Sequence, residues 1–180
     1  MIDAFFERHP DPPADRAAVL AEARAAAAHL REHGVVWCGT LLATSGRFAL
    51  WWLRAADLAS VRTALAGWEG SLWQGTVHGD ADTAELTPEQ SLALVGRRFD
   101  EPVTMESIQA IEYANRNRLA DHRVRFLRSF FSADHRRMLC LYEAPDAESV
   151  RLAQQQAGMP MEIVWAVEYL HPGAASATGL

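Results

Sequence analysis

The stretch RMLCLYEAPDAESVR, residues 137–151, decides the fold because the chain contains it twice. Residues 48–62 read FALWWLRAADLASVR, and the two stretches agree at six of fifteen positions. Both are apolar at first and end in Asp-x-x-Ser-Val-Arg, which predicts a strand followed by a helix with Asp57 or Asp146 as its N-cap. A shift of 89 residues extends the match back to the N-terminus, so we interpret the chain as a tandem repeat.

Each repeat reads as strand, helix, two strands, helix and strand, which is the βαββαβ order of a ferredoxin-like unit. We expect strands at 2–8, 35–42, 47–54 and 71–78, and again at 91–98, 124–131, 136–143 and 162–170. Long helices are expected at 14–33 and 104–121, the second capped by Thr104. The predicted domains are 1–78 and 91–172, with a polar linker at 79–90 and a flexible tail at 173–180.

The predicted strands are apolar on both faces, as in VVWCGTLL at residues 35–42 and EIVWAVEYL at residues 162–170. A sheet with one face in water would instead alternate apolar and polar residues. We therefore predict an α+β fold in which two ferredoxin-like repeats pack sheet to sheet. The product would be an intrachain pseudo-dimer that resembles the dimeric α/β barrels.

Composition excludes several kinds of chemistry. All 17 basic residues are arginine, so the chain can form neither a Schiff-base lysine nor a P-loop. The net charge of −6 argues against nucleic acid as a partner, and no apolar run is long enough to span a membrane. The N-terminus shows no secretory signal, so we expect a cytoplasmic protein. In that setting Cys38 and Cys140 are expected to be buried, unreactive thiols.

The second repeat carries polar residues where the first does not. Glu112 and Asn115 replace alanines on the core face of the long helix, and Arg128 replaces a glycine. Tyr142 and Glu143 replace a leucine and an arginine. One interpretation is a structural hydrogen-bond network. The other is a catalytic pocket in the second repeat, with Glu112 as general acid or base and Asn115, Arg128, Tyr142 and Glu143 around the substrate.

Aromatic residues would supply the apolar wall of that pocket, since five of the six tryptophans lie in the first repeat. The candidate substrate-binding residues are Trp37, Trp51, Trp73, Cys140 and Trp165. This combination predicts a small-molecule enzyme without an organic cofactor. It would act by acid/base chemistry, in an isomerisation, cyclisation or oxygenation, on an apolar or aromatic metabolite.

Histidines at the ends of predicted elements give the alternative of a metal-binding protein. His122 follows a helix, His135 lies in a hairpin turn, and His171 ends the last strand. Imidazole suits nickel and copper ions, so these three residues are candidate metal ligands.

The segment FLRSFFSADHRRMLCLYEAPDAESVR, at residues 126–151, resembles a small bacterial family of ferredoxin-like proteins that includes a nickel-binding member. The resemblance covers about residues 91–172, and residues 1–80 look like a diverged second copy. It implies nickel as a possible ligand and sequestration as the role. A non-catalytic ligand-binding module is a further alternative, and a monomer and a homodimer both remain open.

Overall fold

A computed structural model describes residues 1–79, 86 and 90–175, apart from the side chains of Glu112, Ala174 and Ala175. Within this part of the chain there are eight strands, five α-helices and one 3₁₀ helix, η2 (Pro172–Ala175). None of the described helices is long and apolar enough to cross a membrane. Most of the predicted linker at 79–90, and the tail beyond residue 175, lie outside the described residues.

The strands are joined in one sheet, and this finding overturns the predicted fold class. They are hydrogen-bonded in the order β1-β3-β2-β8-β5-β7-β6-β4 as a closed barrel, rather than as two ferredoxin-like sheets packed face to face. The prediction was wrong because apolar residues on both faces of a strand indicate only that both faces are buried, which a barrel achieves equally well. A closed barrel also removes the unpaired edges that two separate sheets would keep.

The chain divides into two compact units. Among the described residues, unit 1 contains 1–75, 86 and 168–175, and unit 2 contains 76–79 and 90–167. The boundaries fall inside β4 (Ser71–His78) and β8 (Ile163–Leu170). Each of these two strands therefore contributes residues to both units.

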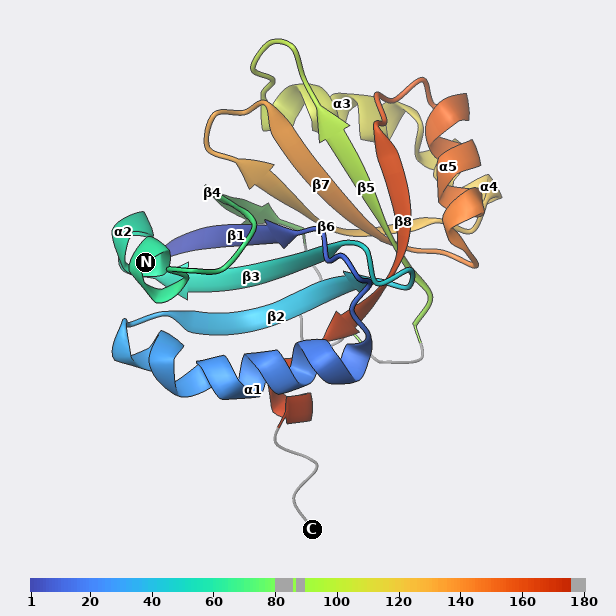
Figure 1. The fold of residues 1–180 in the computed structure, drawn as a ribbon. Coiled ribbons are helices and arrows are strands. Elements are labelled where there is room, and N and C mark those ends of the chain that lie inside the picture. Colours follow the sequence, from blue (N-terminus) through green and yellow to red (C-terminus); the bar gives the residue numbers. More distant parts are fainter. Residues whose placement is uncertain (80–85, 87–89, 176–180) are drawn as a thin grey trace. The chain divides into compact units, whose positions relative to one another are not determined.

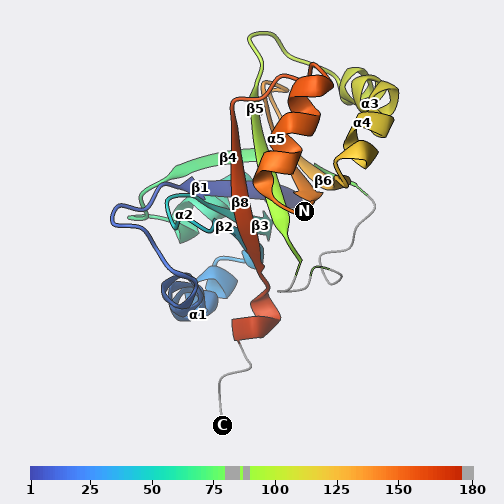
Figure 2. The same ribbon diagram turned by 90° about the vertical axis from the view of Figure 1, so that its right-hand side faces the viewer.

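Unit 1 is an antiparallel sheet covered on one face by two helices (Figure 1). β1 (Ile2–Arg8) pairs with β3 (Ala49–Ala55) and with β4, and β3 pairs with β2 (Val36–Ala43). The covering helices are α1 (Arg16–Glu32) and α2 (Leu58–Ala64). Figure 2 shows η2 following β8 and lying close to α1.

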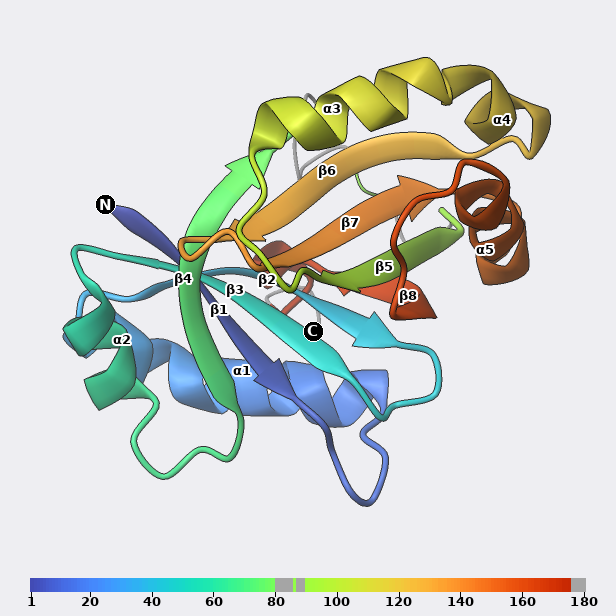
Figure 3. The same ribbon diagram turned by 90° about the horizontal axis from the view of Figure 1, so that it is seen from above.

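Unit 2 repeats this arrangement with a broken long helix. β5 (Leu92–Arg98) pairs with β7 (Arg137–Glu143) and with β8, and β7 pairs with β6 (Arg125–Ser132). Three helices cover one face of the sheet: α3 (Met105–Ala114), α4 (Arg116–Asp121) and α5 (Ala147–Gln156) (Figure 3). All predicted strands and helices are present and begin within two residues of their predicted positions.

The helix N-caps predicted from the repeated sequence are confirmed. The carboxylate of Asp57 accepts a hydrogen bond from the Ser60 amide at 2.8 Å, and that of Asp146 accepts one from the Ser149 amide at 2.7 Å. The backbone bond is the main cause that lowers the pKa of each carboxyl group below its ordinary value. Thr104 likewise accepts a bond from the Ser107 amide at 3.2 Å.

The predicted helix over 104–121 is interrupted at Asn115, which lies between α3 and α4. The side-chain amide of Asn115 donates to the Ile111 carbonyl at 2.9 Å, and so does its backbone amide at 3.1 Å. Asparagine side chains compete with the backbone in this way and weaken helix interiors. A cause of the break was therefore present in the sequence.

In unit 1, a glycine in β2 leaves room for the side chain of Tyr169 in β8. Gly39 has φ of +151°, and a Cβ there would lie 2.3 Å from Oη of Tyr169. That hydroxyl donates to the Cys38 carbonyl at 2.8 Å. In unit 2, Gly79 directly follows β4 and lies against the backbone of β6, where a Cβ would lie 2.7 Å from the Cα of Arg128. Arg128 occupies the position equivalent to Gly39, so this difference between the repeats has a packing explanation.

Candidate functional site

The polar residues predicted to form a pocket in the second repeat lie on different faces of its sheet. Tyr142 and Cys140 are fully buried in the apolar cluster beneath the helices. Arg128 is directly opposite Leu141 in the β6–β7 register, and neighbouring residues of a strand face opposite ways. The buried Arg128 side chain therefore lies on the face away from Tyr142. A register shift between Phe126 and Arg128 produces this placement.

The other predicted catalytic residues are only partly described. Glu112 lies in α3, but its side chain is outside the described part of the structure. Asn115 bonds the Ile111 carbonyl, as above. Glu143 accepts a hydrogen bond at 3.0 Å from Nε of Arg125, its partner across the β6–β7 pair. These contacts favour structural roles for Asn115 and Glu143.

Tyr142 instead contacts Arg97, a cation that is 1% exposed in β5. Nη2 of Arg97 donates to the Tyr142 hydroxyl at 3.1 Å and to the Gln154 side-chain oxygen at 2.8 Å, and Nη1 donates to the Pro160 carbonyl. Burial by itself lowers the pKa of Arg97, but nearby Cys140 and Tyr142 raise it, and the net pKa lies above the ordinary value. This cluster therefore holds a permanent charge inside unit 2.

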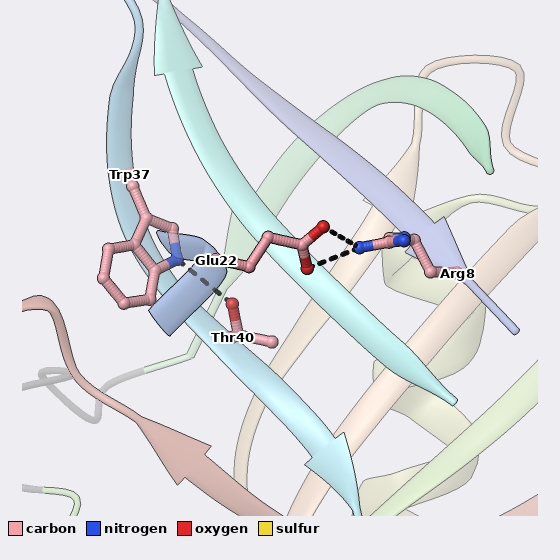
Figure 4. Close-up of polar contacts among 4 residues, drawn as sticks. All are labelled: Arg8, Glu22, Trp37 and Thr40. Carbon is pink, nitrogen blue, oxygen red and sulfur yellow. Dashed lines mark hydrogen bonds and ion pairs between the residues drawn. The ribbon is translucent and has the colours of Figure 1, made fainter. Parts of the chain in front are cut away.

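Arg8 is the equivalent residue of the first repeat, and its partner is a carboxylate. Nη1 of Arg8 donates to both oxygens of Glu22, at 2.6 and 2.7 Å (Figure 4). The guanidinium carbon also lies 5.4 Å from the centre of the Trp68 ring, within the range of a cation–π contact. In the second repeat the position of Glu22 is taken by Ile111, which cannot form this ion pair.

The Arg8–Glu22 pair lines a cavity of about 270 Å³ in unit 1, which we call the Arg8 pocket. Its walls come from β1, α1, β3 and the segment between β1 and α1. They consist of Arg8, Pro10, Ala14, Ala18, Val19, Glu22, Ala49 and Trp51. The pocket thus combines an apolar wall with one cation and one carboxylate, which is the composition expected of a small-molecule site.

Trp51 is one of the residues that line the Arg8 pocket. Its side chain is 1% exposed, and its Nε1–H has no hydrogen-bond partner among the described residues. The neighbouring Trp37, by contrast, donates through Nε1 to Thr40 Oγ1 at 3.1 Å (Figure 4). A buried donor without an acceptor costs on the order of 1–3 kcal/mol, and a bound molecule with an acceptor atom would remove that cost.

The residues predicted to bind a substrate lie on different faces of the sheet and do not form one site. Trp37 and Trp51 belong to the cluster beneath α1 and α2, with ring centres 5.7 Å apart. Trp37 also lines a second cavity, of about 340 Å³, beside α1. Trp73 lies on the other face of the same sheet and donates through Nε1 to Glu7 at 2.6 Å. In unit 2, Trp165 lies opposite Leu94, on the face away from the buried Cys140.

The three predicted metal-binding histidines have separate local partners. Nε2 of His122 lies 3.1 Å from the Gln156 side-chain oxygen, and His135 stacks on Phe131. Nδ1 of His171 accepts a bond from the Gly173 amide at 2.9 Å. Across the described residues, no three His, Cys, Asp or Glu side chains form a group that could hold a metal ion. The described residues therefore do not fit a three-ligand metal centre.

The Arg8 pocket was not among the predicted sites, although the two repeats differ at a position that signals it. The candidate residues were polar side chains gained by the second repeat. Glu22 is a polar side chain that the first repeat carries and the second lacks, at a helix position that can reach Arg8. The same comparison made in the opposite direction would have singled out Glu22, although not its partner.

Comparison with protein families matches the second half of the chain. Residues 94–167 match the family model described as nickel responsive protein SCO4226-like. This segment is therefore similar to the SCO4226-like family. The resemblance predicted for residues 91–172 is thereby confirmed. None of the curated proteins compared with the chain matches it.

Solved structures extend the comparison to the fold. The SCO4226 structure from Streptomyces coelicolor A3(2) is 20% identical, with a TM-score of 0.38, over 42% of this chain and 93% of that one. A putative chlorite dismutase, TA0507, is 11% identical, with a TM-score of 0.50, over 99% of this chain and 98% of that one. A putative monooxygenase from Lactobacillus acidophilus is 8% identical, with a TM-score of 0.45, over 94% and 93% of the two chains. The similarity to TA0507 shows that the chain, including its SCO4226-like segment, shares a known fold.

Proposed function

We propose that the chain binds a small aromatic molecule in the Arg8 pocket and acts on it by acid/base chemistry without an organic cofactor. The observation that carries this proposal is the Arg8–Glu22 ion pair in the wall of a pocket that also contains Trp51, whose buried Nε1–H has no acceptor among the described residues. Native proteins satisfy nearly all buried polar groups. An exception in the wall of a cavity favours a ligand atom as the acceptor.

The dimensions and lining of the pocket define the ligand class. Its volume of about 270 Å³ is near the lower end for small-molecule sites and suits a compound of one or two rings. Val19, Ala49 and the Trp51 ring would contact the flat apolar body of the ligand. A carbonyl, hydroxyl or carboxylate oxygen would accept the Trp51 hydrogen bond.

Among the described residues, Glu22 is the only carboxylate that lines this pocket, and it is the candidate general base. Its two bonds to Nη1 of Arg8 fix its orientation, which is the first requirement for proton transfer. The guanidinium of Arg8 would in turn stabilise negative charge that develops on an oxygen of the ligand. The reaction class that follows is removal of a proton from an acidic O–H or C–H bond.

Intrinsic fluorescence tests the binding step. One- and two-ring hydroxyaromatic acids should quench the emission of the wild-type protein and raise its Tm. Trp51→Phe keeps an aromatic ring but removes the donor, so affinity should fall about tenfold or more. Trp52→Phe is the matched control, because the Trp52 Nε1–H already bonds Asp3 at 2.7 Å. Equal affinity of wild type and Trp51→Phe would refute the assignment of the pocket.

Glu22→Gln tests the chemistry separately from binding. This variant keeps the shape of the pocket and removes the base, so turnover of any substrate found in the screen should fall by 10² or more. Binding should be largely retained. Unchanged turnover would leave the pocket as a binding site and exclude Glu22 as the base.

Nickel binding is a second candidate function, and the family of residues 94–167 supports it. Isothermal titration of tag-free protein with nickel chloride tests it directly. Stoichiometric binding that survives substitution of every histidine in residues 1–90 would assign nickel to the SCO4226-like segment. Absence of heat above the buffer control would remove this candidate.

A further inference from the structure

We infer that His29 and His33, at the C-terminal end of α1, form a two-imidazole binding site for a divalent first-row transition-metal ion. This site lies outside residues 94–167 and involves none of the predicted metal ligands. It is also independent of the Arg8 pocket, whose lining contains neither histidine.

The spacing of the two residues places them together. Residues four apart on a helix lie one above the other on the same face. The side chain of His29 is exposed and that of His33 is half-buried, so an ion can reach both. His33 is the C-cap of α1, and its backbone amide bonds the His29 and Leu30 carbonyls, which holds the turn closed between the two rings.

The distance between the rings matches a chelate. The centres of the two imidazoles are 4.6 Å apart, with an angle of 82° between their planes. Two imidazoles bound side by side to one ion, with metal–nitrogen bonds of about 2.1 Å, have ring centres roughly 4.6–5.3 Å apart as the angle at the metal goes from about 90° to 110°. The observed separation is at the right-angled end of this range, which suits nickel or copper.

The position of the two histidines at the C-terminal end of α1 also favours a bound cation. The last turn of a helix carries partial negative charge from unpaired carbonyls, which favours a bound cation. With two protein ligands, water completes the coordination. A cross-link between residues 29 and 33 also fixes the last turn of α1, so binding should stabilise the folded state.

Calorimetry with nickel chloride on tag-free, full-length protein tests the site, with histidine-to-alanine variants. His29→Ala and His33→Ala should each weaken one nickel site at least tenfold and abolish the nickel-dependent rise in Tm. His9→Ala and His78→Ala are matched controls that should leave this site unchanged. In NMR spectra, paramagnetic nickel should broaden the ring signals of His29 and His33 in the wild-type protein.

Two results would overturn the inference. The first is the absence of any nickel heat that depends on His29 or His33, whatever binding remains elsewhere. The second is that nickel leaves the ring signals of His29 and His33 unbroadened. Both variants should fold normally, because alanine is favourable in helices and the His33 amide bonds use the backbone. Far-UV circular dichroism checks this before the titration is interpreted.

Discussion

The hydroxyl of Tyr142 is one of three oxygen acceptors that surround the buried guanidinium of Arg97. A buried charge needs such partners, because transfer from water to the protein interior removes its hydration. The equivalent cation, Arg8, has a carboxylate partner and is partly exposed. Two arginines at matching positions thus serve different purposes, one inside the packing of unit 2 and one in the wall of a pocket.

Substitution of Tyr142 by Phe tests the structural role of this hydroxyl. The change removes one acceptor of Arg97 with almost no change in volume, so the free energy of unfolding should fall by about 1 kcal/mol. Urea unfolding followed by circular dichroism measures the difference. A normal stability combined with lost ligand turnover would instead support the catalytic role first predicted for Tyr142.

The thiol of Cys38 provides a second test at the level of a single residue. Burial raises its pKa to about 11, while nearby Arg54 lowers it and Asp3 raises it further. The thiolate is the reactive form, so alkylation by iodoacetamide at pH 8 should be roughly 100-fold slower than for an ordinary exposed cysteine. Mass spectrometry after timed labelling gives the rate. The structure leaves Cys38 half-buried rather than buried as expected. Rapid labelling of Cys38 would contradict a protonated thiol.

Among the elements, α5 shows how a short local pattern begins a helix. Asp146 caps it through the Ser149 amide, and this bond lowers the pKa of the carboxyl group. The stabilisation is fully present above the unfolded-state pKa of about 3.9 and is lost as the pH falls through the lower folded-state value.

Two variants of Asp146 separate the cap from the charge. Asp146→Ala should lower the Tm by a few degrees at neutral pH, because alanine cannot accept the amide bond. Asp146→Asn keeps an acceptor, so it should retain most of the stability while losing part of its dependence on pH below 5. Thermal melts between pH 3 and pH 7 make the comparison. Identical pH profiles for wild type and Asp146→Asn would show that the ionised carboxylate contributes nothing.

Local elements were predictable because their determinants lie within a few residues. Asp57, Asp146 and Thr104 each cap a helix through a residue three positions away. The face on which Arg128 lies was not predictable, because it depends on a bulge in the hairpin. Closure of the sheet also depends on pairing between strands far apart in the sequence, and the same apolar pattern suits open or closed sheets.

The contacts of the candidate site were not predictable from local sequence, because they too depend on tertiary packing. Glu22 and Arg8 are separated by a turn and part of a helix, and only the tertiary packing of α1 brings them within 2.7 Å. The unsatisfied donor of Trp51 is likewise a property of packing. The proximity of His29 and His33, in contrast, follows from helical spacing alone, so the sequence contained that signal in full.

At the scale of the whole molecule, the two compact units do not coincide with the two sequence repeats. Unit 1 includes residues from position 168 onward, among them Leu170, which is fully buried in its apolar cluster. Tyr169 also bonds the Cys38 carbonyl within this unit. Removal of these residues would leave the core of unit 1 open and a carbonyl of β2 without its partner.

Separate fragments test this organisation. A fragment of residues 1–79 should melt without a cooperative transition, because it lacks the end of β8. The same fragment produced together with residues 80–180 should form a complex that melts cooperatively. Size-exclusion chromatography and thermal circular dichroism distinguish the cases. A cooperative melt of residues 1–79 alone would show that the first repeat is an independent domain.

The shared strand β8 also affects the timing of folding during synthesis. The ribosome releases the first 75 residues of unit 1 long before it reaches Tyr169 and Leu170. During that interval the apolar cluster beneath α1 stays incomplete, and its exposed surface is open to chaperones or to aggregation. The final step in folding of the N-terminal unit is therefore set by translation of a strand that begins only at Ile163.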